Sequence, residues 1–138
     1  MREDRGMTVR GVQLFSIPVS DQDGARDFSV DVLGLELLED RPMGPGRRWV
    51  RVRPRGGETA ITLVTWFESM PAGSTTGVVL ETDDVEAEAA RLTALGVPIA
   101  GGVQEAPWGR YVQLQDPDGN GLILQQSTAG AGPVSDAG

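Results

Sequence analysis

Two stretches of this chain determine its fold: Ile17–Asp21, which reads IPVSD, and Leu80–Asp84, which reads LETDD. Each begins with apolar residues and ends in a residue that can cap a helix. Each is followed by a helix-like segment that ends in Leu-Gly, and the two copies are offset by 62 to 63 residues. A repeat of this length indicates two copies of one supersecondary unit. Two open units that face each other tend to leave a cleft for a small molecule.

Each copy predicts the order β-α-β-β-β. In the first copy, alternation around Phe15 predicts a half-buried strand, and Ser20 or Asp21 is placed to cap a helix that ends near Leu33. The residues Asp116–Asn120, which read DPDGN, predict a tight turn before the last strand, so Asp116 and Asp118 are expected to serve the backbone. The expected strands cover 13–19, 35–39, 48–53 and 58–66 in the first copy and 77–82, 97–100, 110–115 and 121–126 in the second, whose helix is expected over 84–95.

The length of 138 residues suits one domain, or two half-domains that share a core. We expect a single domain over residues 9–126, with module 1 at about 9–67 and module 2 at about 76–126. Residues 1–8 and 127–138 are expected to be flexible tails. The predicted fold class is α+β, with two tandem βαβββ modules forming a concave sheet that bears a cleft.

The composition excludes several classes of function. A net charge of −8 and a pI near 4.4 argue against nucleic-acid partners and against anionic membrane surfaces. No segment reaches the roughly 20 apolar residues of a membrane span, and no signal peptide is visible, so a cytoplasmic location is expected. The chain has no histidine and no cysteine, which excludes a Ser-His-Asp triad, a thiolate nucleophile and a zinc-thiolate site.

The order of elements, together with the segments 18–21 (PVSD), 32–35 (VLGL) and 116–120 (DPDGN), resembles the vicinal oxygen chelate superfamily. That superfamily includes glyoxalase I, extradiol dioxygenases, fosfomycin-resistance enzymes and bleomycin-resistance proteins. The resemblance covers about residues 10–126, and residues 40–46 and 107–109 resemble one bacterial branch. It implies the glyoxalase/bleomycin resistance fold. We also expect a homodimer, because an incomplete cup of this size is often completed by a partner subunit.

The same resemblance implies where a divalent metal would be held in metal-using members. The corresponding positions here are Leu14, Thr62 or Val64, Gly77 and Ile123. None of them offers the imidazole or carboxylate that Fe, Mn, Ni or Zn prefers, so we expect no metal and no other cofactor. A shift of one residue would bring Gln13 to the first position, but it would also turn every side chain of the strand to the opposite face.

Strand alternation separates a core face from a cleft face in both modules. The side chains expected to bind the ligand from the cleft face are Leu14, Ser16, Thr62, Val64, Gly77, Val79, Tyr111, Gln113, Ile123 and Gln125. Trp49, Trp66 and Trp108 can supply aromatic walls, with packing in the core or a dimer interface as the alternative. Arg51 can clamp an anionic group, with a solvated strand face as the alternative.

Glu81 is the one catalytic candidate. A carboxylate inside an apolar cleft would have a raised pKa and could act as a general base. The alternative is that Glu81 hydrogen-bonds to a neighbouring strand or pairs with an arginine.

These observations give three functional hypotheses, in order of preference. The first is a metal-free small-molecule-binding protein that holds a hydrophobic or aromatic ligand in an aromatic-lined cleft. The second is a metal-free lyase or isomerase in which Glu81 is the base and Tyr111 or an arginine stabilises an enolate-like charge. The third is a metal-dependent lyase, isomerase or dioxygenase with an atypical site. The sequence leaves open whether a reaction is catalysed and which ligand is bound.

Overall fold

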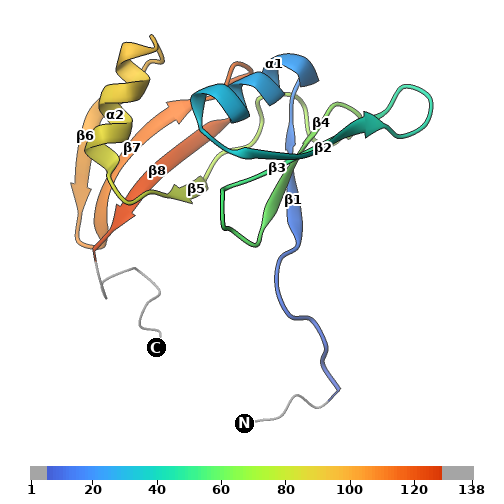
Figure 1. Ribbon diagram of the computed structural model, residues 1–138, viewed down its shortest axis with the longest axis horizontal. Coiled ribbons are helices and arrows are strands. Elements are labelled where there is room, and N and C mark those ends of the chain that lie inside the picture. Colours follow the sequence, from blue (N-terminus) through green and yellow to red (C-terminus); the bar gives the residue numbers. More distant parts are fainter. Residues whose placement is uncertain (1–5, 129–138) are drawn as a thin grey trace.

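The computed structural model describes residues 6–128 and contains two modules with the same order of elements (Figure 1). Module 1 consists of β1 (Leu14–Pro18), α1 (Gln22–Asp27), a π-helical turn η1 (Phe28–Val32), β2 (Glu36–Pro42), β3 (Arg48–Arg53) and β4 (Ala60–Val64). Module 2 consists of β5 (Val78–Glu81), α2 (Val85–Ala94), β6 (Ala100–Ala106), β7 (Gly109–Gln115) and β8 (Gly121–Ser127). The predicted α+β class and the tandem βαβββ modules are confirmed.

The two modules form separate four-stranded sheets with equivalent strand orders, β1-β4-β3-β2 and β5-β8-β7-β6. In each sheet the first strand pairs in parallel with the last, and the other neighbours pair antiparallel. The parallel pair follows from the helical crossover after the first strand, because a short hairpin can join only antiparallel strands. Each helix covers one face of its own sheet (Figure 1). We call the opposite face of each sheet its outer face.

Both helices begin at the aspartates that the repeat marks. The side chain of Asp21 accepts a hydrogen bond from the Asp23 N–H, and that of Asp84 accepts one from the Ala87 N–H. The first helix then widens into the π-helical turn, where the Ser29 hydroxyl donates to the Ala25 carbonyl at 2.8 Å. Capping by the side-chain oxygens satisfies backbone donors that have no partner inside the helix, which explains why both repeats start in this way.

Strand β6 differs from the prediction, which placed it at 97–100. The Val97 N–H bonds to the Leu92 carbonyl at the end of α2, and Pro98 has no N–H to offer a sheet. Pairing with β7 therefore begins at Ala100 and passes an irregularity before Gln104. Strand β8 extends through Ser127, the first residue of the expected C-terminal tail, and residues 1–5 and 129–138 of the expected tails lie outside the described residues.

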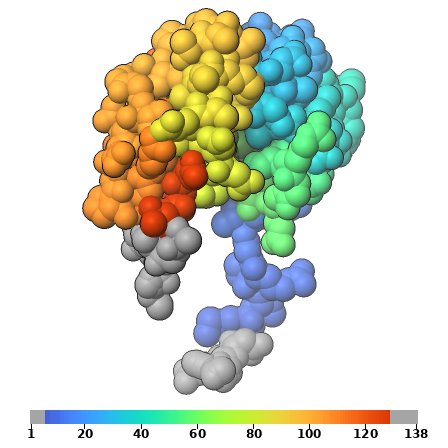
Figure 2. Space-filling model, turned by 60° about the vertical axis from the view of Figure 1, so that its left-hand side comes forward, coloured from blue at the N-terminus to red at the C-terminus, as the bar shows by residue number. Residues whose placement is uncertain are grey.

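Burial follows the alternation expected from the sequence. Ile17 and Val19 of module 1 and Leu122 and Leu124 of module 2 are buried, and they belong to one continuous apolar core that spans both modules. Residues 6–13, in contrast, extend away from the body of the molecule (Figures 1 and 2), and Val9 is 92% exposed. No helix among residues 6–128 combines the length and the apolar character that crossing a bilayer requires.

The DPDGN turn joins the two modules. The Asn120 amide is fully buried and donates to the Pro18 carbonyl at 2.9 Å and to Asp116 at 2.7 Å, while its oxygen accepts the Thr75 N–H at 3.0 Å. Asp118 accepts two bonds from Ser20, one from the hydroxyl at 2.6 Å and one from the N–H at 3.1 Å. The acids of this turn thus serve the backbone, as expected, and they also fix module 2 to the end of β1.

Candidate functional site

The outer face of the first sheet combines an indole with charged side chains. Val50 and Val52 are fully buried against α1, so Trp49 and Arg51, which alternate with them on β3, project from the outer face. Arg51 is paired across the sheet with Thr62, whose hydroxyl lies 2.8 Å from that of Ser16. The structure therefore groups four of the predicted site residues on this face.

Glu39 on β2 organises this group. Its Oε1 accepts a hydrogen bond from the Trp49 indole N–H at 2.6 Å and another from the Arg51 Nε at 2.9 Å. Arg41 reaches the other oxygen at 3.4 Å. The bond from Trp49 and the two arginines lower the pKa of Glu39 below its usual value, because each favours the charged carboxylate. The indole ring is thus held in one orientation by a charge-assisted bond.

The sequence reasoning missed Glu39. A usable signal was present, since an acid on the strand before the alternating stretch 48–53 can pair across the hairpin with its tryptophan and arginines. The exact pairing depends on an irregular register between Leu37 and Glu39, which alternation alone does not reveal.

Asp40, the next residue on β2, points to the helix side. It accepts hydrogen bonds from Arg48 at 2.8 and 2.9 Å and from Arg26 of α1 at 2.8 Å. These guanidinium groups, Arg48 first, hold the pKa of Asp40 well below its usual value. Two adjacent acids therefore have separate roles: Glu39 orders the outer face, and Asp40 ties the β2–β3 hairpin to α1.

The remaining predicted residues of the first sheet have different accessibilities. Leu14 and Ser16 are half-buried, whereas Thr62 and Val64 are each only 1% exposed. Neighbouring side chains therefore cover Thr62 and Val64, and a ligand on the outer face would not contact either residue directly.

Trp66 and Trp108 lie outside the strands. Trp66 follows β4, packs edge-on against Phe67 with ring centroids 6.0 Å apart, and has the Arg47 guanidinium 5.8 Å from its own centroid. Trp108 lies in the turn between β6 and β7, and its carbonyl accepts the Thr128 N–H. It takes no part in the hydrogen bond from Asn120 to the Pro18 carbonyl, which joins the two modules.

The outer face of the second sheet is apolar and amide-bearing. Val79 is 51% exposed and pairs with Ile123, which in turn lies beside Gln113. Tyr111 and Gln125 form the next cross-strand pair on this face. Gly77, Gln113 and Ile123 line a cavity of about 570 Å³ that extends toward the loop after α2. These five predicted side chains and the predicted glycine thus share one face of module 2.

Glu81 is not buried in an apolar cleft. The residue is exposed, and its carboxylate accepts hydrogen bonds from the Ser127 N–H and hydroxyl, both at 2.9 Å. This is the alternative role foreseen for it, a bond to the neighbouring strand. The expectation of apolar burial around Glu81 is therefore wrong in this chain.

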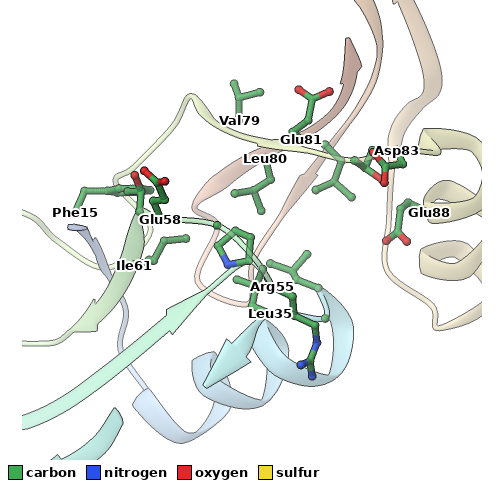
Figure 3. Close-up of a pocket in the computed structure, with 17 residues that line it drawn as sticks. Phe15, Leu35, Arg55, Glu58, Ile61, Val79, Leu80, Glu81, Asp83 and Glu88 are labelled. Atoms are coloured by element: carbon green, nitrogen blue, oxygen red, sulfur yellow. The ribbon is translucent and has the colours of Figure 1, made fainter. Parts of the chain in front are cut away.

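A larger cavity of about 650 Å³ lies between the modules (Figure 3). Its lining includes Phe15 and Ile61 from module 1 and Leu80 and Leu124 from module 2. Val79 and Glu81 are the two predicted site residues that border it, and the others lie elsewhere.

The positions that correspond to metal ligands do not fit a transition metal. Leu14, Gly77 and Ile123 offer no donor atom, and the Thr62 hydroxyl is already bonded to Ser16. Among residues 6–128, no group of three or more acidic, histidine or cysteine side chains is arranged to hold a metal ion.

Known proteins share this sequence and architecture. YetH of Bacillus subtilis (strain 168) is 31% identical over 121 residues, which cover 86% of this chain and 99% of YetH. The crystal structure of TnmS3, described as an antibiotic binding protein from Streptomyces sp. CB03234, has 48% identity and a TM-score of 0.84, covering 88% of this chain and 99% of TnmS3. A structure from Sphaerobacter thermophilus DSM 20745 has 35% identity and a TM-score of 0.80, covering 86% of this chain and 98% of its own.

The model of one protein family, described as the Glyoxalase/Bleomycin resistance protein/Dioxygenase superfamily, matches residues 11–124. That span contains every strand and helix of both modules except the end of β8. The Sphaerobacter protein is described as a member of the same superfamily. On the strength of this match and of the shared fold, the chain belongs to the Glyoxalase/Bleomycin resistance protein/Dioxygenase superfamily.

Proposed function

We propose that this protein is a metal-free small-molecule-binding protein that holds a planar hydrophobic or aromatic ligand against Trp49. The observation that carries the proposal is the fixed indole on the outer face of the first sheet, bonded to Glu39 at 2.6 Å. A ring that is already immobilised loses little conformational freedom when a flat ligand stacks on it. The side chains at the metal-ligand positions support a binding role over metal chemistry.

The comparison with TnmS3 supports the same proposal. TnmS3 is described as an antibiotic binding protein, and it is 48% identical to this chain over nearly its whole length. We propose that this chain likewise sequesters or carries a compound with a rigid aromatic part. The uncharged amides of Gln113 and Gln125 on the second sheet suit hydrogen bonds to the carbonyl or hydroxyl groups of such a ligand.

We further propose that the binding cleft is completed in a homodimer. One chain leaves part of these outer faces exposed, including Val79 at 51% exposure. A second copy that places its amide-bearing sheet opposite the Trp49 sheet would enclose a ligand between two different walls. Native mass spectrometry of protein purified without chelators measures the oligomer mass, any bound metal and any retained compound in one experiment. A monomer would contradict the proposed dimer. A stoichiometric divalent ion would contradict the proposed metal-free site.

The ligand site is tested by fluorescence with a neutral planar probe, 9-anthracenemethanol. We expect the probe to quench tryptophan emission in the unmodified protein, to lose most of this effect in Trp49→Ala, and to retain it in the control Trp108→Phe. Trp66→Ala measures how much of the quenching depends on Trp66, the other predicted aromatic wall. Equal quenching in Trp49→Ala and in the unmodified protein would show that this pocket assignment is wrong.

A further inference from the structure

The cavity between the modules has a lining unlike that of either outer face. Its volume is about 650 Å³, and its floor is made of apolar side chains from both modules: Phe15, Leu33, Leu35, Ile61, Leu80 and Leu124. Cavities of roughly 300–1,000 Å³ with such a floor accommodate molecules of drug size. Figure 3 shows Ile61 of module 1 and Leu80 of module 2 among the side chains that line it.

The rim of this cavity carries an excess of negative charge. Four carboxylates line it, those of Glu58, Glu81, Asp83 and Glu88, against the single guanidinium of Arg55. Glu88 is already paired with Arg91. Within residues 6–128, Glu58 and Asp83 have no cationic partner.

Arg55 does not neutralise this rim. In Figure 3 its guanidinium lies at the opposite end of the view from Glu81 and points away from the carboxylates. No ion pair joins Arg55 to another described residue. The acidic side of the cavity is therefore open to a cation from solution.

We propose that this cavity binds an organic cation with an apolar body, such as a protonated arylalkylamine. The apolar body would displace water from the floor, and the ammonium group would lie at the rim, where Glu58, Glu81 and Asp83 together supply negative charge around the cavity. Such a ligand satisfies both halves of the lining, whereas an anion of the same shape is repelled by the rim. This site is separate from the Trp49 face, so the proposal goes beyond the proposed function and does not depend on it.

Three probes with one ring system and different charge test the proposal by isothermal titration calorimetry: 1-naphthylmethylammonium, 1-naphthalenemethanol and 1-naphthoate. We expect the ammonium to bind about tenfold more tightly than the naphthoate, with the neutral alcohol between them. Raising NaCl from about 50 to about 500 mM should weaken the ammonium several-fold and leave the alcohol unchanged. Equal affinities for the three probes would overturn the proposal.

Substitution of the unpaired acids locates the site. The double variant Glu58→Gln, Asp83→Asn should lower the affinity for the ammonium about five- to tenfold and spare that for the alcohol. The control Asp31→Asn, Glu68→Gln removes the same charge from exposed residues outside the cavity lining. An equal loss in both double variants would show that only the net charge of the protein matters, and would overturn the site.

A last variant separates this proposal from the proposed function. In Trp49→Ala, which removes the outer-face site, the ammonium should bind as in the unmodified protein. A loss of binding in Trp49→Ala would place the ammonium on the outer face and would overturn the cavity assignment. Failure of 9-anthracenemethanol to quench Trp49, with the charge-dependent binding intact, would instead count only against the proposed function.

Discussion

The two modules share one backbone plan and differ in what they display. Both begin with an aspartate-capped helix, both pair their first strand with their last, and both bury alternate apolar residues beneath the helix. Their outer faces differ: module 1 carries the Glu39, Trp49 and Arg51 group, and module 2 carries amides and aliphatic side chains. The comparison shows that packing against the helix requires apolar side chains on one face of each sheet, whereas the side chains of the outer face can differ between the modules.

The turns before the last strands differ in the same way. In module 2, Asp116–Asn120 is bonded to Pro18 and Thr75 and holds the modules together. In module 1 the connection between β3 and β4 makes no hydrogen bond to module 2 among the described residues, and its residues Pro54, Arg55 and Glu58 line the cavity instead. One turn joins the modules, and its counterpart leaves space between them.

The strongest test of this contrast is Asn120→Ala. The change removes the side-chain bonds from Asn120 to the Pro18 carbonyl and to Asp116, and it leaves the Thr75 N–H without its acceptor, all at a fully buried residue. We expect the free energy of unfolding to fall by about 3 kcal/mol in urea denaturation. Ser20→Ala, which removes an exposed bond of the same turn, should cost less than about 1 kcal/mol. Similar losses in the two variants would show that Asn120 has no special role in the junction.

A smaller effect is expected for Gly73→Ala. Gly73 has a φ of +84°, and an added Cβ would overlap the carbonyl oxygen of Asp118 in the joining turn. Gly96→Ala is the matched control, since its φ of +82° is similar and its Cβ would meet nothing within 4 Å. Thermal unfolding should show a loss of about 2 kcal/mol for Gly73→Ala and about 1 kcal/mol for the control. If the control loses as much, backbone strain alone explains both variants.

Glu39→Ala tests the specialised face of module 1. Without the carboxylate the indole of Trp49 loses its acceptor and Arg51 its partner, so we expect the affinity for 9-anthracenemethanol to fall about three- to tenfold. The control is Glu36→Ala on the same strand, which breaks a longer contact with Arg53 of 3.4 Å. A shift of the tryptophan emission maximum in Glu39→Ala alone would report the freed indole. Unchanged affinity in Glu39→Ala would show that the indole needs no support from Glu39.

The smallest effect concerns Asp40 and depends on pH. The folded pKa of Asp40 lies below its ordinary value of 3.8, so its stabilising contribution is full above about pH 4 and is lost as the pH falls toward the folded pKa. Asp40→Asn should therefore lower the free energy of unfolding by about 1 kcal/mol at neutral pH, after allowance for solvent screening. Urea denaturation at pH 7 and at pH 3 should show the difference shrinking. A constant difference would mean that shape, and not charge, accounts for the loss.

The repeat and the alternation predicted most of the fold, because both depend on local properties of the chain. The caps at Asp21 and Asp84 and the buried faces around Ile17 and Leu122 needed no knowledge of distant contacts. The start of β6 was misplaced because the backbone of Val97 is taken by the end of the preceding helix. A residue pattern read along the chain does not show this competition.

The site was less predictable. Alternation assigned the correct faces to Trp49 and Val79, but it could not show that Thr62 is covered or that Glu81 is exposed, since both depend on neighbouring strands. The role of Glu39 required the register of the β2–β3 pair, and the cavity between the modules required their relative placement.

The bond from Asn120 to Pro18 spans 102 residues of sequence. At the usual synthesis rate of about 5–20 residues per second, Pro18 leaves the ribosome roughly 5–20 s before Asn120, its partner in the joining turn. During that interval Ile17 of β1 and Leu63 of β4, which line a small cavity together with Leu80 and Leu122 of module 2, lack these neighbours. A chain that ends before residue 120 would lack the joining turn and part of this apolar contact, and exposed apolar surface of this kind favours aggregation.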